Sequence, residues 1–277
     1  GRKTGWRRRS GANCSSGPEE LLETLRTIGL YFDGFISVLP NAGLPELVNG
    51  KTVYRATPEY MADYALKFVK LGVNLVGGCC GTNPDHIRAI AKALKNKKPA
   101  KRAFIGGLTL ASRTRVVRVA DDTMPLVIGE RINPTNRKDL FADLSAGKMT
   151  VARNDAVTQV KNGAAVLDVN MGAAGLNETE LMKQAVANIQ NTVEVPIAID
   201  TMSAEALETG LKEYAGKPLI NSVNGKAKSI ASVIPLAAKY GAALIGLTIN
   251  EKGIPKKVAE RIAIAKKIVT QAAKAGI

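Results

Sequence analysis

The sequence predicts an α/β protein in which short parallel strands alternate with helices. Apolar runs of strand length alternate strictly with amphipathic helical stretches, which implies a parallel sheet or barrel. Hydrophobic residues make up 45% of the 277 residues, but aromatic residues only 4%. This balance suits helices packed on aliphatic strands better than an all-β sandwich. A chain of this length holds one large or two smaller domains.

The first series of elements is expected within residues 10–98. Pro18 and Pro84 fall where a helix accepts proline, in its first turn. The expected order is strand, helix, strand, helix, strand, helix, over the segments 11–28, 35–46, 58–72 and 73–96.

Residues 99–123 separate this series from the next one. They are rich in Lys, Arg and Gly and show no steady period, so we interpret them as a linker. Residues 1–9, with the sequence GRKTGWRRR, match no element of either series and form an unmatched basic start.

The second series is expected within residues 124–277. Its strands are expected at 125–134, 165–170, 196–200, 218–225 and 242–250. Its helices are expected to end near 164 and to cover 178–190, 203–214, 228–241 and about 255–275.

Polar residues recur at the carboxyl ends of these strands. Parallel α/β folds, and (β/α)8 barrels in particular, place their sites at this end. Asp and Asn at a strand end also commonly cap the next helix, but their recurrence on successive strands favours a site. The residues are Glu130, Asp168, Asn170, Asp200, Asn221 and Asn250.

The chain has three cysteines, Cys14, Cys79 and Cys80, and two of them are adjacent. They are either inert core thiols or joint ligands of a metal. Their number and spacing do not indicate a disulfide framework, so we expect a reducing, cytoplasmic environment. The most apolar window, residues 231–249, is interrupted by proline, lysine and glycine, and no membrane span is expected.

The formal net charge is +15, and a basic surface can bind nucleic acid. However, no helix-turn-helix, zinc-finger or RNA-recognition signature is visible, and aromatic residues for base stacking are scarce. We therefore interpret the charge as a solvated basic surface and keep nucleic-acid binding as an alternative of another class.

Several motifs resemble a known family. GANCSSGPEEL, PNAGLP and GGCCGTNPDHI resemble the homocysteine-binding barrel of the cobalamin-dependent methionine synthases. IGERINPTNR, VLDVNMG, AIDTMSAEALETGL, PLINSVNG and GAALIGLTINEKGIPK resemble its neighbour, the methyltetrahydrofolate-binding barrel, which is also found in corrinoid/folate methyltransferases. The resemblance covers roughly residues 10–277.

The resemblance implies two (β/α)8 TIM-barrel domains, both truncated in this chain. Residues 10–98 would supply about the last three strands of the homocysteine- and zinc-binding barrel. Residues 124–277 would supply about the first five strands of the pterin-binding barrel. We therefore expect a fragment of a longer methyltransferase that is inactive alone.

By resemblance, a zinc ion is held by Cys14, Cys79 and Cys80. Thiolates are soft zinc ligands, and three protein ligands leave the fourth tetrahedral position for the homocysteine sulfur. Asn41 is a weaker candidate for that position when no substrate is present. His86, the only histidine, is expected at a helix end and not on the metal.

The resemblance also assigns the polar strand ends of the second series. Asp200 and Asn221 are expected to contact the pterin ring, whose amide-like edge needs a carboxylate beside an amide. Glu130, Asp168 and Asn170 are expected to line the same mouth. The methyl group would pass from 5-methyltetrahydrofolate to cobalamin on another domain or protein, and then to homocysteine.

An alternative hypothesis for the enzymatic function depends only on the second series of elements. A corrinoid/folate methyltransferase or a dihydropteroate-synthase-like enzyme would also bind a pterin there. This reading leaves the three cysteines unexplained.

Overall fold

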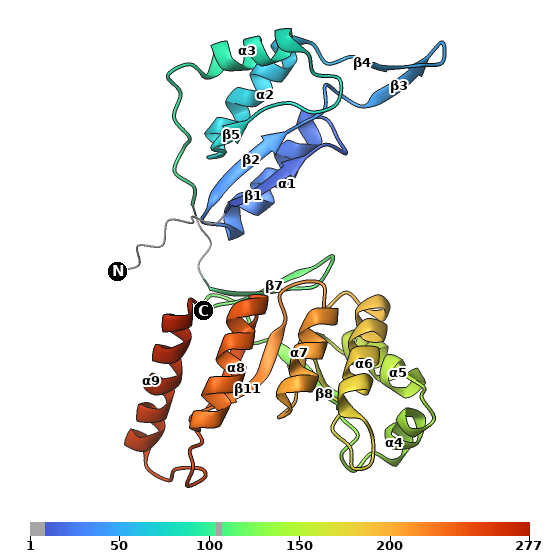
Figure 1. The fold of residues 1–277 in the computed structure, drawn as a ribbon, viewed down its shortest axis with the longest axis vertical. Helices are drawn as coiled ribbons and strands as arrows, with labels where there is room; N and C mark the ends of the chain where they lie inside the picture. Colours follow the sequence, from blue (N-terminus) through green and yellow to red (C-terminus); the bar gives the residue numbers. More distant parts are fainter. Residues whose placement is uncertain (1–8, 104–106) are drawn as a thin grey trace. The chain divides into compact units, whose positions relative to one another are not determined.

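A computed structural model describes residues 9–103 and 107–277, and the chain divides into two compact units near residue 106. Figure 1 shows the helices and strands of each unit. Both units are α/β with parallel sheets, which confirms the predicted fold class. Residues 1–8 of the predicted basic start lie outside the described residues.

The first unit is built on a parallel sheet of three strands in the order β1-β2-β5. Its strands are β1 (Arg9–Asn13), β2 (Phe35–Leu39) and β5 (Leu75–Val76), and its helices are α1 (Pro18–Tyr31), α2 (Pro58–Lys70) and α3 (Pro84–Leu94). Pro18 and Pro84 begin α1 and α3, as expected, and Pro58 begins α2 in the same way. The core lies between sheet and helices, where Leu25, Ile36, Val38 and Phe68 are buried.

Between β2 and α2 the structure adds a hairpin that the sequence analysis did not predict. Strands β3 (Pro45–Val48) and β4 (Lys51–Tyr54) pair antiparallel and extend away from the rest of the unit (Figure 1). Asn49 and Gly50 join them with φ of 49° and 74°. An Asn-Gly pair with two positive φ values is the common two-residue hairpin turn, so the signal was present in the sequence.

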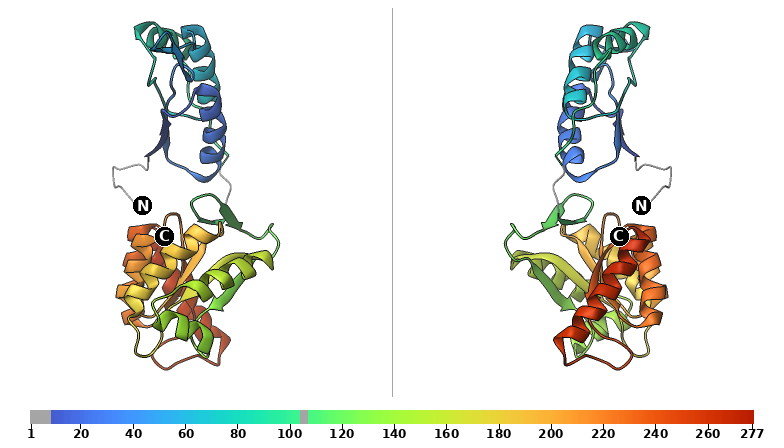
Figure 2. Two further views of the ribbon diagram at one scale, coloured as in Figure 1. Left: turned by 90° about the vertical axis from the view of Figure 1, so that its right-hand side faces the viewer. Right: turned by 90° about the vertical axis from the view of Figure 1, so that its left-hand side faces the viewer.

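The second unit is built on a parallel sheet of five strands in the order β12-β11-β10-β9-β8. The strands are β8 (Val127–Ile132), β9 (Ala164–Asn170), β10 (Ile197–Asp200), β11 (Leu219–Asn224) and β12 (Ala243–Leu247). The helices are α4 (Lys138–Ser145), α5 (Thr150–Lys161), α6 (Glu178–Thr192), α7 (Ala204–Glu213), α8 (Ala227–Tyr240) and α9 (Val258–Ala275). The helices that alternate with the strands cover one face of the sheet (Figure 2).

Successive side chains along the strands point to opposite faces of the sheet, so the core of this unit consists of two clusters, one on each face. In β10, Ile197 and Ile199 join the large cluster that packs against the helices, whereas Ala198 joins a small cluster on the other face. Successive side chains of a strand point to opposite faces, so burial of both faces gives the continuous apolar runs that the sequence shows. Neither sheet closes within the described residues, and β8 and β12 are the edges of the larger one.

The segment interpreted as a linker contains a second antiparallel hairpin. Strands β6 (Leu108–Ala111) and β7 (Val116–Val119) pair with each other, and Ala111 also forms a backbone bridge to Lys217 of the second unit. Leu110 is only 1% exposed and packs in the small cluster. The interpretation as an irregular linker is thus wrong for residues 108–119, because interspersed basic residues hid the strand alternation.

None of the described helices combines the length and the apolar character that crossing a membrane requires.

The hairpin is predicted to stabilise the second unit through Leu110. Replacing Leu110 with Ala leaves a cavity among well-packed neighbours and should lower the free energy of unfolding by about 3 kcal/mol. Leu108→Ala is the matched control, because Leu108 lies on the same strand but is 38% exposed. Urea unfolding followed by circular dichroism measures both. Equal losses in the two variants would contradict the packing described for Leu110.

Candidate functional site

The three cysteines of the first unit meet at the carboxyl end of its sheet. Cys14 follows β1, and the Cys79-Cys80 pair follows β5. The Sγ atom of Cys80 lies 3.7 Å from that of Cys14 and 3.9 Å from that of Cys79, and all three sulfur atoms lie within 4.8 Å of one another. These residues are called the sulfur cluster below.

Backbone contacts with the middle strand hold the cluster in place. The Cys14 N–H donates to the carbonyl of Leu39, and the Cys79 N–H donates to the carbonyl of Pro40. Cys14 has a φ of 58° and Ser15 a φ of 55°, so the chain turns sharply at the end of β1. Such values are uncommon for residues other than glycine and often occur at functional positions.

Glycines beside the cysteine pair allow close packing. A Cβ atom at Gly78 would lie 2.5 Å from Thr82 Cγ2, and one at Gly77 would lie 2.9 Å from Leu39 Cδ2. The two glycines therefore permit a close approach of neighbouring side chains.

Asn41, the weaker ligand candidate, is 4% exposed and lies beside the cluster. Its Oδ1 atom accepts a hydrogen bond from the Cys80 N–H at 3.1 Å. The amide thus positions the backbone of Cys80. His86 is placed elsewhere, because its Nε2 atom donates to the carbonyl of Ala56 and its ring takes part in the capping of α3 by Asn83.

The close sulfur atoms influence one another's ionisation. The pKa of Cys14 is lowered, first by a backbone hydrogen bond from Ser15 and then by hydrogen bonds from Cys79 and Cys80. The pKa of Cys79 is raised, chiefly by its hydrogen bond to Cys14 and by burial. Thiolates at this separation repel one another, so a bound cation is needed to stabilise all three.

In the second unit, four of the five predicted pterin residues meet at the carboxyl ends of β9, β10 and β11. The Asn170 amide donates to the Asp200 carboxylate at 2.9 Å, and the Asn221 amide donates to the Asp168 carboxylate at 2.9 Å. Asp200 is paired in register with both Asn170 and Asn221. Glu130 is exposed on the edge strand β8 and acts on the group through its charge.

Asp168 has the most perturbed environment of these residues. It is 4% exposed, and burial raises its pKa to about 6, with further increases from the charges of Asp200 and Glu130. The hydrogen bond from Asn221 opposes this shift without cancelling it. A carboxyl group with a pKa near neutrality can hold or release a proton under physiological conditions.

Thr201 and Glu178, which the sequence did not single out, also support this group. The Thr201 hydroxyl donates to the Glu178 carboxylate and accepts from the Ser203 N–H, and the Thr201 N–H donates to the Asn221 carbonyl. Thr201 is 6% exposed. Its position directly after Asp200 was the only signal available, and a threonine there reads equally well as part of the next helix start.

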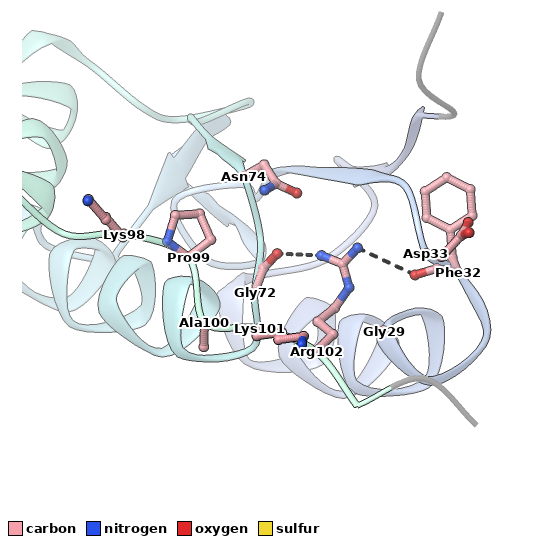
Figure 3. A pocket seen from close by; sticks show the side chains of 10 residues that line it. All are labelled: Gly29, Phe32, Asp33, Gly72, Asn74, Lys98, Pro99, Ala100, Lys101 and Arg102. Carbon is pink, nitrogen blue, oxygen red and sulfur yellow. Dashed lines mark hydrogen bonds between the residues drawn. The ribbon is translucent and has the colours of Figure 1, made fainter. Parts of the chain in front are cut away.

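A cavity of the first unit lies at the other end of the strands, where Phe32 and Gly72 precede β2 and β5 (Figure 3). The Arg102 guanidinium donates to the carbonyls of Phe32, Gly34 and Gly72. Sites in parallel barrels lie at the carboxyl ends of the strands, and residues at the amino ends serve stability. We therefore assign Arg102 the role of fixing the chain after α3 to the sheet.

Comparison with known proteins agrees with this division. Residues 8–94 match the family Homocysteine S-methyltransferase, and residues 129–277, more than half of the chain, match the family Pterin binding enzyme. The chain belongs to the pterin binding enzyme family. The matches to both families confirm the resemblance on which the two halves were interpreted.

The chain is also similar to two curated relatives. It is 33% identical over 265 residues to methionine synthase of Mycobacterium tuberculosis and 31% identical over 270 residues to that of Mycobacterium leprae. Each alignment covers 94% of this chain but 22% of the relative. The chain therefore spans about a fifth of the length of these relatives.

Among solved structures, the chain is similar to 7,8-dihydropteroate synthase of Vibrio fischeri ES114. The two are 19% identical, with a TM-score of 0.44, and the match covers 62% of this chain and 63% of that one.

The raised pKa of Asp168 predicts a pH-dependent cost to stability. Because its pKa is about 6 in the folded chain against an ordinary value of 3.8, the protonated group favours folding at low pH. That contribution is lost as pH rises through about 6. Asp168→Asn removes this titrating group. The unfolding free energy of the variant, minus that of the original chain, should therefore increase by up to about 2 kcal/mol as pH rises from 4 to 6.

Urea unfolding of both proteins at pH 4 and pH 7 measures this difference. A difference in unfolding free energy that is the same at both pH values would show that Asp168 titrates normally.

Proposed function

We propose that this chain is part of a methionine synthase, which transfers a methyl group from 5-methyltetrahydrofolate to homocysteine. The observation that carries the proposal is the sulfur cluster at the strand ends of one unit, joined in the same chain to a pterin binding unit. Neither family alone explains both features. The order of the two units also matches that of the relatives over 94% of this chain.

We assign zinc to Cys14, Cys79 and Cys80. A tetrahedral zinc with Zn–S bonds of about 2.3 Å places its sulfur ligands about 3.8 Å apart. The observed separations of 3.7 Å and 3.9 Å suit this geometry. Zinc at this site would keep the sulfur of a bound homocysteine as a nucleophilic thiolate at neutral pH.

Within the first unit, the protein residues define the position of the reacting sulfur. Three cysteines leave one tetrahedral position open, and the Asn41 amide lies beside Cys80. Because Asn41 already accepts a hydrogen bond from the Cys80 N–H, we assign it a positioning role ahead of the alternative role of fourth zinc ligand.

In the second unit, we assign the pterin ring to Asp200 and Asn221, with Glu130, Asp168 and Asn170 around them. Carboxylate and amide groups side by side match the donors and acceptors of a pterin edge. Asp168, whose pKa is about 6, would hold a proton near the bound ring. Proton transfer toward the pterin nitrogen makes tetrahydrofolate a better leaving group.

Cobalamin is proposed to reach both sites from another domain or protein, and a cytoplasmic location is proposed from the free cysteines. A dihydropteroate-synthase-like or corrinoid/folate methyltransferase activity of the second unit alone is less well supported, because neither activity would explain the three clustered cysteines of the first unit. Nucleic-acid binding rests on net charge only.

The zinc assignment predicts about one zinc per chain. A Cys79→Ser, Cys80→Ser double variant should lose it, because a single thiolate cannot retain the ion. His86→Gln is the matched control, since His86 is a possible zinc ligand that the structure places outside the cluster, and this variant should keep its zinc. Metal analysis after dialysis measures all three proteins. Equal zinc in the original chain and the double variant would refute the homocysteine half of the proposal.

The pterin assignment predicts saturable binding of 5-methyltetrahydrofolate. Asp200→Asn replaces a charged acceptor by a group of equal size and should weaken binding about tenfold or more. Asp121→Asn, an exposed change outside the strand ends, should leave the affinity unchanged. Calorimetric titration at two salt concentrations separates this site from a nucleic-acid surface, because electrostatic binding to a polyanion falls steeply with salt.

A further inference from the structure

Strand β8 contains a bulge where it reaches the polar group of the second unit. Gly129 and Ile132 of β8 are three positions apart, but they pair with residues of β9 that are only two positions apart. Glu130 and Arg131 therefore lie opposite the single residue Asp168. A bulge of this kind leaves a backbone group without its partner in the sheet and redirects the side chains beside it.

The bulge keeps Glu130 on the same face of the sheet as Asp168. The neighbours of Asp168 on β9 belong to the large cluster that packs against the helices, so Asp168 lies on the opposite face. Ile132 belongs to the same large cluster, and a Cβ atom at Gly129 would point at Gln159 of α5. Without the bulge, two residues three positions apart would face opposite sides. With it, both face the helices, and Glu130 turns to the other face.

Helix α5 holds both backbone polar groups of Arg131, the residue after Glu130. The Arg131 N–H donates to Gln159 Oε1 at 2.8 Å. The Arg131 carbonyl accepts from the Arg137 guanidinium at 2.9 Å, and this guanidinium also donates to Asp155 at 2.9 Å. Gln159 and Asp155 are four positions apart and thus share one face of α5. The side chains of Arg137 and Asp155 are only 17% and 19% exposed.

The glycine in the bulge allows Gln159 to reach its partner. A Cβ atom at Gly129 would lie 2.6 Å from Gln159 Oε1, so a side chain there would push the amide away from Arg131. Among the residues that the structure describes, the buried Gln159 Nε2 atom has no hydrogen-bond partner. The amide oxygen is therefore the functional end of this side chain.

We propose that Gln159 is a positioning residue that keeps Glu130 on the pterin-binding face by holding the bulge of β8. The inference rests on the proposed pterin site and adds a residue to it. Strand β8 is an edge of the described sheet, so its pairing is fixed from one side only. A slip of one residue would move its side chains to the other face, and the bond from Arg131 to Gln159 opposes that slip.

Gln159→Met tests this role, because methionine has a similar length but no acceptor oxygen. We expect 5-methyltetrahydrofolate to bind about fivefold to tenfold more weakly, since the unpartnered Arg131 N–H no longer holds the bulge. Gln159→Glu keeps an acceptor oxygen and should restore the affinity. Gln184→Met is the matched control on α6, where the amide donates to Glu180 of the same helix, and it should leave the affinity unchanged. Calorimetric titration measures each variant.

A double-variant cycle separates positioning from general support of the fold. Glu130→Gln alone should weaken binding. If Gln159 acts through Glu130, adding Gln159→Met to that variant should weaken binding little further. Urea unfolding checks that every variant is folded under the titration conditions. Gly129→Ala displaces the same amide and takes the place of Gln159→Met if that variant is unfolded.

Two results would overturn the role of Gln159 while leaving the pterin site standing. One is unchanged affinity in Gln159→Met or in Glu130→Gln. The other is an equal loss from Gln159→Met with and without Glu130→Gln, which would mark a purely structural role. Absence of saturable 5-methyltetrahydrofolate binding to the original chain would overturn both the role of Gln159 and the pterin assignment.

Discussion

Parallel pairing of neighbouring strands is the constraint on which both candidate sites depend. In the first unit, Asn13 pairs with Leu39, and Val38 pairs with Val76. This register ends β1 and β5 at the same level on either side of β2, so residues 65 positions apart (79 minus 14) meet without a local metal-binding loop. In the second unit, the pairing of Asp200 with Asn170 and with Asn221 does the same for the pterin residues.

Both sites also concentrate groups that resist ionising together. The sulfur cluster brings three thiols within 4.8 Å, and the proposed divalent cation would stabilise them as thiolates. The second unit places Asp168 and Asp200 at adjacent strand ends, and there a retained proton on Asp168 relieves the repulsion. In the proposed methyl transfer, a metal in the first unit would suit the thiolate that accepts the methyl group, and a proton in the second unit would suit the pterin nitrogen that must be protonated.

The strand ends could be predicted because each short apolar run is followed by an amphipathic helical pattern, and the boundary between the two marks where the parallel strand stops. The polar residues toward the ends of β9 to β11 were found by that logic, whereas Cys14, Cys79 and Cys80 were assigned from the family resemblance. The two hairpins were missed for a different reason. The Asn49-Gly50 turn lies between strands too short to show a clear period, and Leu110 lies in a short strand within a segment whose basic residues are typical of a linker.

X-ray absorption at the zinc edge of the zinc-loaded chain tests the central claim most directly. The account predicts three sulfur atoms at about 2.3 Å with one lighter atom, and four sulfur atoms after homocysteine is added. A first shell dominated by nitrogen and oxygen, or one with fewer than three sulfur atoms, would contradict it.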